Sequence, residues 1–446
     1  MLLLTARPRV MSVPERLPMT LRAYHRAMSA ASPLASLWLK RRLRRGKELK
    51  ERLPERHGEP TLPRPDGPLV WLHGASVGEL TSVFPLIERL RQQDVRILVT
   101  SGTVTSAAIV KDRLPNDVLH QFIPLDTPRF VRRFLHHWRP DLGLFIESDL
   151  WPNLIVASEK VRIPLVLING RMSEQSFKGW RSLRRTAKAI LGKFDLGLAQ
   201  SALDAERFAE LGLPIVHVTG NLKLDVPAPP ADEAKLAELQ HAIANRPVFV
   251  AASTHPGEDQ AIIEAHRRVR KSRPALLTII APRHPHRGKD ILDYAVSAGS
   301  RGMLRSHGIL PDGHTDIYVA DTIGELGLFY RLAHIVFMGG SIVEHGGQNP
   351  IEAAKLGRPI LHGPHIGNFA DIYAALDAAR GAEEIENIGH MAMRIGDLLK
   401  DAATRKAIGD AGHRTVERLG GALDRTMNEL EPYLMQLRLA HQASNA

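Results

Sequence analysis

From about Pro68 onward, short apolar runs alternate with longer amphipathic stretches. Runs rich in Val, Ile and Leu and bounded by Gly, Pro, Asn or Asp are typical of strands buried in a parallel sheet. The runs predicted as strands before residue 221 span 69–73, 95–100, 118–123, 142–147, 164–169, 195–200 and 215–220. The stretches between them, such as 128–138 and 201–212, carry apolar residues at helical spacing and predict helices that cover the sheet.

The alternation stops at residues 223–247, where clustered prolines indicate a linker followed by a helix. It then restarts, with strands predicted at 248–253, 275–282, 316–321, 334–340 and 359–363. The pattern predicts an α/β chain with two Rossmann-like domains facing a central cleft, where strand carboxyl ends present ligand sites. We expect an arm at 1–55, domains at 56–226 and 227–415, and a helical segment at 416–446 packing back on the first domain.

Composition narrows the class of protein. A chain of 446 residues is too long for one core and suits two domains of about 200 residues each. The apolar fraction of 44% and charged fraction of 24% are those of a globular protein. The absence of cysteine excludes disulfides, thiolate metal sites and cysteine nucleophiles.

The net charge of +11 is concentrated at the start of the chain. The first 50 residues hold 12 Lys or Arg and 2 Glu, so the rest is almost neutral. A basic body would indicate a nucleic-acid partner, whereas a basic arm on a neutral body indicates contact with an anionic surface. We therefore expect no nucleic acid and an anionic membrane surface as a partner.

The arm itself is predicted to be helical. Its second helix starts at Ser32-Pro33 and carries Leu34, Leu37 and Trp38. No uncharged apolar run approaches the roughly 18 residues that a membrane span needs, and basic residues interrupt any signal-peptide core. Two interpretations remain open: a surface helix packed on its own domain, or an interfacial helix facing anionic lipid.

A glycine-rich loop follows the predicted strand 334–340. Asn349, Pro350 and Glu352 have the spacing of a helix N-terminal cap, but capping does not explain the four glycines at 339, 340, 346 and 347. Because glycine lets a backbone approach a ligand closely, the loop predicts a nucleotide phosphate site. It is neither a Walker loop nor a dinucleotide fingerprint.

Basic and imidazole side chains follow other strands of the same domain. Arg283 stands at a strand end, where a guanidinium can bind a phosphate through two hydrogen bonds. His255, His284 and His286 lack the spacing of a metal site, so we expect no metal.

Two acidic residues in the first domain stand where parallel strands end. Asp149 is predicted to cap the following helix, which leaves Glu147 without a capping role and favours a place in the cleft. Lys223 opens the linker, either as a functional cation or as a solvated lysine.

Glu79 and Ser76 have the S-x-x-E spacing of a capping box. Gly74 and Gly78 beside them clear space that capping alone does not need. A helix N-terminus also keeps a carboxylate ionised, which a general base requires.

Seven segments in this order resemble the Kdo transferases: "HGASVGE", "IESDLWPNLI", "GNLK", "STHPGE", "PRHP", "DTIGELGLFY" and "GGSIVEHGGQNPIEAA…GPHIGNF". The resemblance runs from about Arg56 to Leu419. It implies a GT-B fold and an inverting enzyme that moves 3-deoxy-D-manno-octulosonic acid (Kdo) from CMP-Kdo to the phosphorylated lipid A precursor. It implies no metal and no cofactor, and a place at the cytoplasmic face of the bacterial inner membrane. Many members begin with an apolar anchor, whereas this chain begins with the basic arm.

The resemblance also assigns site residues. It implies that Glu79 is the general base and that Glu147 and Lys223 stabilise the transition state. The residues implied to bind CMP are Pro282, Arg283, Ile323, Gly324, Glu325, Asn349, Pro350, Ile351 and Glu352. The alternatives are a GT-B transferase or epimerase for another nucleotide sugar, and a non-catalytic membrane-associated nucleotide-binding protein. A dehydrogenase is disfavoured because neither domain has the dinucleotide fingerprint.

Overall fold

A computed structural model describes residues 17–445 of the chain. These residues form two compact units, one made of 17–226 together with 420–445, and one made of Pro227–Leu419. The sequence predicted that the chain leaves the second unit and rejoins the first at residue 416. In the structure helix α19 (Ala402–Leu419) still belongs to the second unit, and the chain rejoins the first unit at residue 420.

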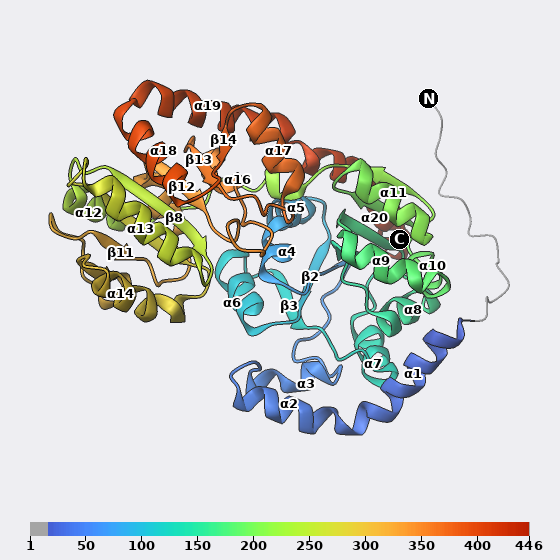
Figure 1. The fold of residues 1–446 in the computed structure, drawn as a ribbon. Helices are drawn as coiled ribbons and strands as arrows, with labels where there is room; N and C mark the ends of the chain where they lie inside the picture. Colours follow the sequence, from blue (N-terminus) through green and yellow to red (C-terminus); the bar gives the residue numbers. More distant parts are fainter. Residues whose placement is uncertain (1–16, 446) are drawn as a thin grey trace. The chain divides into compact units, whose positions relative to one another are not determined.

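Unit 1 is built on a seven-stranded parallel sheet with the order β3-β2-β1-β4-β5-β6-β7 (Figure 1). Its strands are β1 Leu69–His73, β2 Arg96–Ser101, β3 Val118–Phe122, β4 Leu142–Ile146, β5 Leu165–Gly170, β6 Leu196–Ala199 and β7 Val216–Val218. The apolar runs of the sequence predicted all of these strands. The chain reverses its direction across the sheet between β3 and β4, so β1 and β4 are neighbours and the ends of both strands lie at the usual ligand-binding point of such folds.

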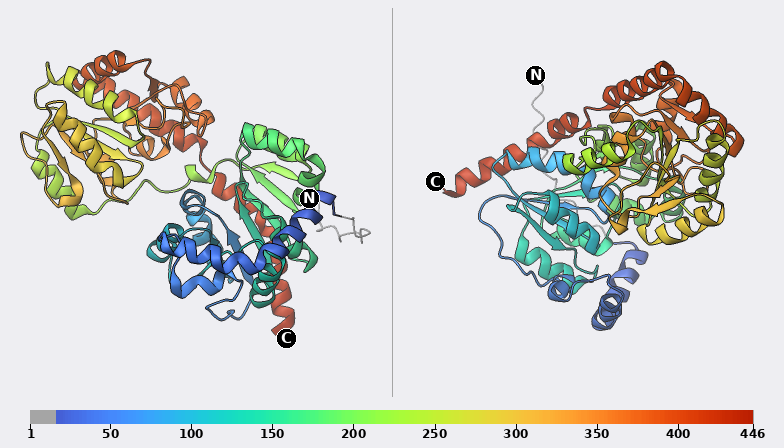
Figure 2. Two further views of the ribbon diagram at one scale, coloured as in Figure 1. Left: turned by 60° about the horizontal axis from the view of Figure 1, so that its bottom comes forward. Right: turned by 90° about the vertical axis from the view of Figure 1, so that its left-hand side faces the viewer.

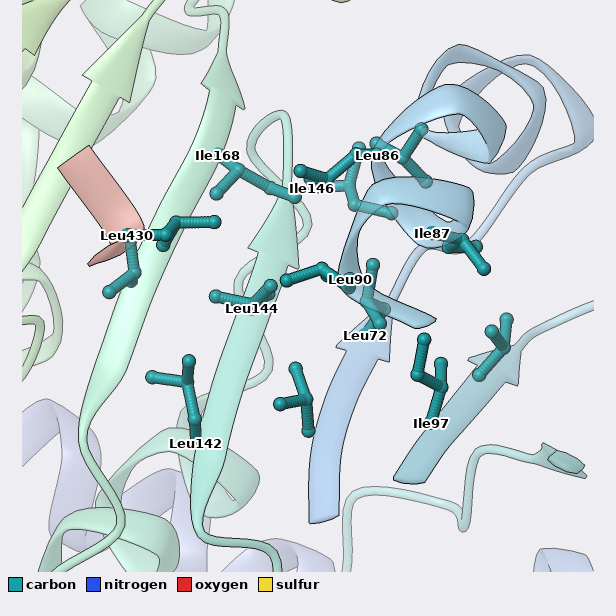
Figure 3. Packing of buried hydrophobic residues seen from close by; sticks show 14 of the residues in the cluster. Leu72, Leu86, Ile87, Leu90, Ile97, Leu142, Leu144, Ile146, Ile168 and Leu430 are labelled. Atoms are coloured by element: carbon teal, nitrogen blue, oxygen red, sulfur yellow. The ribbon is translucent and has the colours of Figure 1, made fainter. Parts of the chain in front are cut away.

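Alternate side chains of the central strands enter two cores. Val70 and Leu72 lie in one core with α5 (Phe84–Arg91) and α6 (Val104–Arg113). Leu69 and Trp71 lie in the other core with α7 (Pro128–Trp138), α8 (Pro152–Lys160), α10 (Arg184–Leu191) and α11 (Ala202–Leu211). Figure 3 shows the first core, where Leu86, Ile87 and Leu90 of α5 meet residues of β1, β2, β4 and β5. Burial on both faces explains why these strands lack polar alternation.

The helices of unit 1 have the following bounds: α1 Met19–Ala31, η1 Ser32–Leu34, α2 Ala35–Arg44, η2 Lys50–Arg52, α3 Leu53–Arg56, α4 Val77–Ser82, α5 Phe84–Arg91, α6 Val104–Arg113, α7 Pro128–Trp138, α8 Pro152–Lys160, α9 Glu174–Ser182, α10 Arg184–Leu191, α11 Ala202–Leu211, η3 Leu222–Leu224 and α20 Ala422–Asn445. Helix α20 contributes Leu430 and Leu434 to the first core and runs alongside the strands of unit 1 (Figure 2). The last helix of the chain therefore completes the fold of the first unit.

The first 16 residues of the predicted arm lie outside the described residues. Residues 17–55 are largely helical, as the sequence predicted, and one of their faces is covered. Leu21, Ala35 and Leu39 are buried, and the Tyr24 hydroxyl donates a hydrogen bond to Asp126 at 2.9 Å. The burial of Tyr24 and the nearby Asp126 charge raise the pKa of its hydroxyl. The opposite face leaves Leu34, Leu37 and Trp38 exposed by 65%, 69% and 49%. The arm thus packs on its own unit and still presents an apolar face.

Unit 2 has a second seven-stranded parallel sheet, in the order β10-β11-β9-β8-β12-β13-β14. Its strands are β8 Val248–Thr254, β9 Leu277–Pro282, β10 Gly302–Leu304, β11 Ile317–Val319, β12 Ile335–Met338, β13 Ile360–His362 and β14 Ala382–Glu384. The sequence analysis predicted five of them and missed the two edge strands, β10 and β14, which have three residues each.

The helices of unit 2 are α12 Glu233–Ile243, α13 Glu258–Arg270, η4 Pro285–Arg287, α14 Gly288–Ser297, η5 Arg305–His307, α15 Leu326–Leu332, α16 Ile351–Lys355, α17 Ala370–Ala378, α18 Ile388–Lys400 and α19. Helices α13, α14 and α18 share one core with the strands. Helices and parallel sheets of this kind make both units Rossmann-like, as the sequence predicted.

Candidate functional site

Glu79 occupies the first turn of α4, directly after β1. The hydroxyl of Ser76 accepts a hydrogen bond from the Glu79 amide at 3.3 Å and donates one to Glu79 Oε1 at 2.9 Å. Glu79 Oε2 accepts a hydrogen bond from the Ala75 amide at 2.7 Å. The capping arrangement predicted from the spacing is therefore present, and it fixes the position of the carboxylate.

The pKa of Glu79 is raised, chiefly by its burial and next by the negative charge of Glu147. Hydrogen bonds from Ser76 and Ala75 oppose this shift but do not cancel it, and Asp149 adds to it. Burial and two neighbouring carboxylates therefore outweigh the hydrogen bonds at the helix N-terminus. A raised pKa makes the Glu79 carboxylate a stronger base.

Asp149 does not cap α8, contrary to the prediction. The residue before α8 is Trp151, and no side chain caps that helix. Asp149 Oδ2 instead lies 3.1 Å from Nε2 of the buried His73 and accepts the indole N–H of Trp151 at 2.8 Å. Burial would raise the pKa of Asp149, but these hydrogen bonds and the His73 charge outweigh it and lower that pKa.

Glu147 and Lys223 form an ion pair at the edge of the same sheet. Lys223 Nζ donates a hydrogen bond to Glu147 Oε1 at 2.7 Å, and both side chains are less than one fifth exposed. Glu147 follows β4 in the left-handed backbone region, with φ of 60°. This conformation is unfavourable for a residue with a side chain, and such strain is typical of functional positions.

The short helix that carries Lys223 is held by two asparagines. The buried Asn169, at the end of β5, accepts the Leu222 amide at 3.0 Å. Asn221 accepts the Lys223 amide at 3.0 Å. Lys223 therefore belongs to unit 1 and has a fixed backbone, which does not match a solvated lysine on a mobile hinge.

In unit 2, the segments predicted to bind CMP follow strands that lie close together in the sheet. Pro282 ends β9, residues 323–325 follow β11, and residues 349–352 follow β12, in a sheet where β11, β9, β8 and β12 are consecutive. Because parallel strands end at the same edge, the structure brings all three segments to one edge of this sheet.

The loop after β12 is organised by Glu258, a residue that the sequence analysis did not assign to the site. Its carboxylate is fully buried and accepts the amides of Gly340 at 2.7 Å, Ser341 at 3.0 Å and Ile342 at 3.0 Å. A fourth bond comes from the His255 amide at 2.9 Å. The amides of these three residues are therefore occupied by Glu258 and do not face a phosphate.

The glycines of the loop are explained by the packing of the protein itself. A side chain at Gly339 would lie 2.4 Å from the Ser253 carbonyl oxygen. Gly346 and Gly347 have φ of 81° and 73°, which favours glycine. The glycines therefore carry no independent evidence for a ligand.

A cluster of imidazoles and guanidinium groups lies beside this loop. The rings of His255 and His345 stack with centroids 4.2 Å apart, and His284 contacts both His255 and His286. Burial lowers the pKa of His255 to about 4, and the neighbouring cations act in the same direction. Arg283 is exposed and, within residues 17–445, has no carboxylate within ion-pair distance. This cluster can attract an anion.

The remaining residues predicted to bind CMP differ in the hydrogen bonds and the exposure of their side chains. Asn349 accepts the Ile351 amide at 3.0 Å, so it caps α16, and its amide group lies 3.4 Å from Glu352 Oε1. Glu325 instead binds Arg305 through two hydrogen bonds of 3.0 Å, which lower its pKa to about 2. The adjacent Ile323 is 75% exposed.

The sequence thus predicted that the site residues stand at the edges of two sheets. It did not predict the buried side chains that bond to these residues or to their loops. His73, Asn169 and Glu258 are buried and make their bonds to partners distant in sequence. Glu258 ends the segment "STHPGE" of the resemblance, but the sequence gave no sign of its bonds, because acids are common in the first turn of any helix.

The chain is similar to curated Kdo transferases along most of its length. The relative from Arabidopsis thaliana, a probable mitochondrial 3-deoxy-D-manno-octulosonic acid transferase, is 38% identical over 80% of this chain and 83% of its own. The 3-deoxy-D-manno-octulosonic acid transferases of Haemophilus influenzae and Bordetella pertussis are both 34% identical, over 86% and 92% of this chain and 92% and 99% of their own.

Residues 49–226 match the family model described as 3-deoxy-D-manno-octulosonic-acid transferase. Among solved structures, a glycosyltransferase from Rickettsia africae has a TM-score of 0.58 with 14% identity, over 83% of this chain and 98% of its own. The UDP-GlcNAc 2-epimerase of Neisseria meningitidis has a TM-score of 0.57 with 14% identity, over 82% and 99%. These two structures share the fold, and the sequence relatives show that the chain belongs to the 3-deoxy-D-manno-octulosonic acid transferases and is a glycosyltransferase.

Proposed function

We propose that this enzyme transfers Kdo from CMP-Kdo to a hydroxyl of the phosphorylated lipid A precursor, with inversion and without a metal ion. The observation that carries the proposal is the arrangement at the edge of the unit 1 sheet. There the carboxylate of Glu79 is held by Ser76 and Ala75, and its pKa is raised by burial and by Glu147.

In the proposed reaction Glu79 accepts the proton of the acceptor hydroxyl. The oxygen attacks the sugar carbon that bears the CMP phosphate, a new C–O bond forms, and CMP leaves with the electron pair of the broken bond. A single displacement of this kind inverts the carbon. Lys223, oriented by Glu147 at 2.7 Å, supplies positive charge that favours the departing phosphate.

The donor is proposed to bind at the edge of the unit 2 sheet. The exposed guanidinium of Arg283 and the imidazoles of His284 and His345 attract the phosphate of CMP. Glu352, in the first turn of α16, accepts hydrogen bonds from ribose hydroxyls. Because Glu325 is bonded to Arg305, its segment contributes through the backbone of Ile323 and Gly324.

The arm is proposed to rest on the cytoplasmic face of the bacterial inner membrane. Within residues 17–445, none of the helices combines the length and apolar character that crossing a bilayer requires. The arm does present a cavity of about 310 Å³ lined by Trp38, Arg41, Arg42, Arg45 and Lys47, beside the exposed Leu34 and Leu37. Basic and apolar groups together suit an anionic lipid surface.

Mass spectrometry of the product made from CMP-Kdo and lipid A precursor tests the proposal directly. The expected result is acceptor mass increased by one or more Kdo residues with the parent enzyme and no product with Glu79→Gln. Calorimetry of CMP and of UDP binding to the Glu79→Gln variant tests the identity of the donor nucleotide separately. Preference for UDP would favour another nucleotide sugar, and CMP binding without any transfer would favour the non-catalytic alternative.

A further inference from the structure

A groove of about 750 Å³ runs along the outer surface of unit 1, between α7 and α8. It is lined by His25, Pro128, Arg132, Leu135, His136, Arg139, Pro140, Asp141, Asn153, Val156, Ala157, Lys160, Val161, Arg162 and Ile163. Figure 1 shows α7 and α8 side by side, with α1 next to them. The volume is within the range of small-molecule sites, and none of these residues belongs to the site proposed above.

The groove is amphipathic along its length. Lining residues recur at helical spacing on both helices, from Pro128 to Arg139 on α7 and from Asn153 to Lys160 on α8. Leu135, Val156 and Ala157 provide an apolar floor. Of the basic residues, Arg139, Lys160 and Arg162 stand at the C-terminal ends of the two helices, at the amino edge of the sheet, and Arg132 stands in the middle of α7.

These basic side chains have no anionic partners. Among residues 17–445, no carboxylate lies within ion-pair distance of Arg132, Arg139, Lys160 or Arg162. The one acid of the lining, Asp141, is engaged by Arg64 at 3.3 Å and by the Leu69 amide at 2.8 Å. The groove therefore carries positive charge that nothing in the described chain neutralises.

Two of these arginines occupy strained backbone positions. Arg139 has φ of 41° and Arg162 has φ of 65°, both in the left-handed region that glycine adopts at helix ends. A glycine at either position would relieve the strain. The chain instead places a guanidinium at each helix end, next to the same groove, and such strain indicates a functional constraint.

We propose that this groove binds one anionic phospholipid of the membrane on which the arm rests. Its phosphate is bound by Arg139 and Arg162, and an acyl chain lies along Leu135, Val156 and Ala157. The groove is continuous with the arm, because His25 of α1 lines it and its Nδ1 atom lies 2.9 Å from Asn153 Oδ1. Charge complementarity and an apolar floor together favour an amphiphile over a free anion.

Calorimetry with monomeric dodecyl phosphate, below its micelle concentration, tests the proposal on the full chain. The expected result is binding of one molecule per chain. Inorganic phosphate and an uncharged dodecyl amphiphile should each bind at least about tenfold more weakly, because each lacks one half of the ligand.

The variant Arg139→Gly with Arg162→Gly separates binding from folding. It should weaken dodecyl phosphate binding by about tenfold or more, while the melting temperature stays equal or rises because strain is removed. Ala157→Phe fills the floor and should weaken dodecyl phosphate binding to a similar extent. The matched control is Arg267→Gln with Arg268→Gln on α13 of unit 2, which removes two exposed charges outside the groove and should leave binding unchanged.

Several outcomes would overturn the inference. One is dodecyl phosphate binding that survives both Arg139→Gly with Arg162→Gly and Ala157→Phe. Another is inorganic phosphate binding as tightly as dodecyl phosphate, which would mean a simple anion site. A third is equal loss in the Arg267 and Arg268 control, which would mean attraction by net charge alone. None of these readouts depends on Kdo transfer, so failure here is distinct from failure of the proposed function.

Discussion

The Nζ atom of Lys223 lies 2.7 Å from Oε1 of Glu147, and the second residue of this pair has a left-handed backbone with φ of 60°. This ion pair is little exposed, and its acidic member, Glu147, has a strained backbone at the end of the central strand β4. The pair is the most specific chemical feature of unit 1, because the carboxylate both orients the lysine and raises the pKa of the neighbouring Glu79.

The strain at Glu147 predicts that two variants with the same loss of activity differ in stability. Glu147→Ala and Glu147→Gly both remove the carboxylate, so both should lose most transferase activity. Glycine adopts positive φ without a steric penalty, so Glu147→Gly should be more stable than Glu147→Ala by about 1 kcal/mol in denaturant unfolding. Equal stability of the two variants would show that the backbone at Glu147 is not strained.

Glu79 is predicted to be the general base. Glu79→Gln should lower turnover by roughly a hundredfold or more. CMP binding should be retained, and the fold should be at least as stable at neutral pH. The stability follows from the raised pKa, because a carboxylate that is costly to ionise in the folded protein destabilises it as pH rises. Near-normal turnover with a lowered melting temperature would instead mean that Glu79 only caps α4.

The raised pKa also sets the pH profile. A base acts when deprotonated, so kcat/KM should fall as the pH is lowered through the pKa of Glu79, which lies above the usual range of glutamate. Residual activity of Glu79→Gln should lack this acidic limb. Glu88→Gln on the surface of α5 is the matched control and should keep the parent profile.

Glu352 is predicted to bind the ribose of CMP. Glu352→Ala should weaken CMP affinity by about tenfold or more, since a hydrogen bond to a charged group contributes roughly 1.5–3 kcal/mol. Glu264→Ala on α13 makes the same change at a side chain that pairs with Arg267 and Arg268 on the surface, and should leave affinity unchanged. Calorimetry measures both, and equal CMP affinity in the parent and Glu352→Ala would contradict the assignment.

Glu258 is predicted to hold the loop after β12 in place. Glu258→Gln replaces one carboxylate oxygen by an amide that cannot accept backbone N–H groups, in a position that receives four of them. The free energy of unfolding should fall by about 3 kcal/mol or more, and CMP affinity should fall with it. The exposed Glu233→Gln on α12 should change neither quantity. Parent-like unfolding of Glu258→Gln would show that the loop does not depend on this carboxylate.

Much of the fold was predictable because its central strands are buried on both faces. A run such as residues 69–73 is apolar without interruption, and that pattern identifies a strand by itself. The two edge strands of unit 2 gave no such signal: β14 consists of Ala382–Glu384, and two of its three residues are acidic. Edge strands pair on one side only and need less apolar surface.

For the candidate site, the sequence predicted only which residues stand at strand ends, and not the bonds that hold them. The sequence placed Glu79 and Glu147 there, but the bonds of Glu258 join residues 82 to 84 positions apart, and no spacing rule reaches that far. The raised pKa of Glu79 could not be predicted for the same reason. It depends on burial and on the charge of Glu147, which a local reading of the α4 N-terminus does not contain.

The arm is predicted to bind membranes peripherally and in part through charge. Arg41, Arg44 and Arg45 are exposed next to Leu34, Leu37 and Trp38, whereas Arg42 is bonded to Glu48 at 2.7 Å and is needed for packing. In vesicle flotation, the parent should bind anionic lipid much more than neutral lipid, and binding should fall as salt screens the charges.

The sharpest variant replaces Arg41, Arg44 and Arg45 with Gln and keeps Arg42. Each basic group near an anionic surface contributes about 1 kcal/mol, so the triple variant should bind roughly a hundredfold more weakly. Activity on a detergent-dispersed acceptor should largely survive, because these side chains lie outside the proposed site. Replacing Arg267, Arg268 and Arg414 of unit 2 removes the same charge and should leave flotation unchanged. Binding that resists salt and yields only to detergent would mean a buried anchor, and the peripheral interpretation would be wrong.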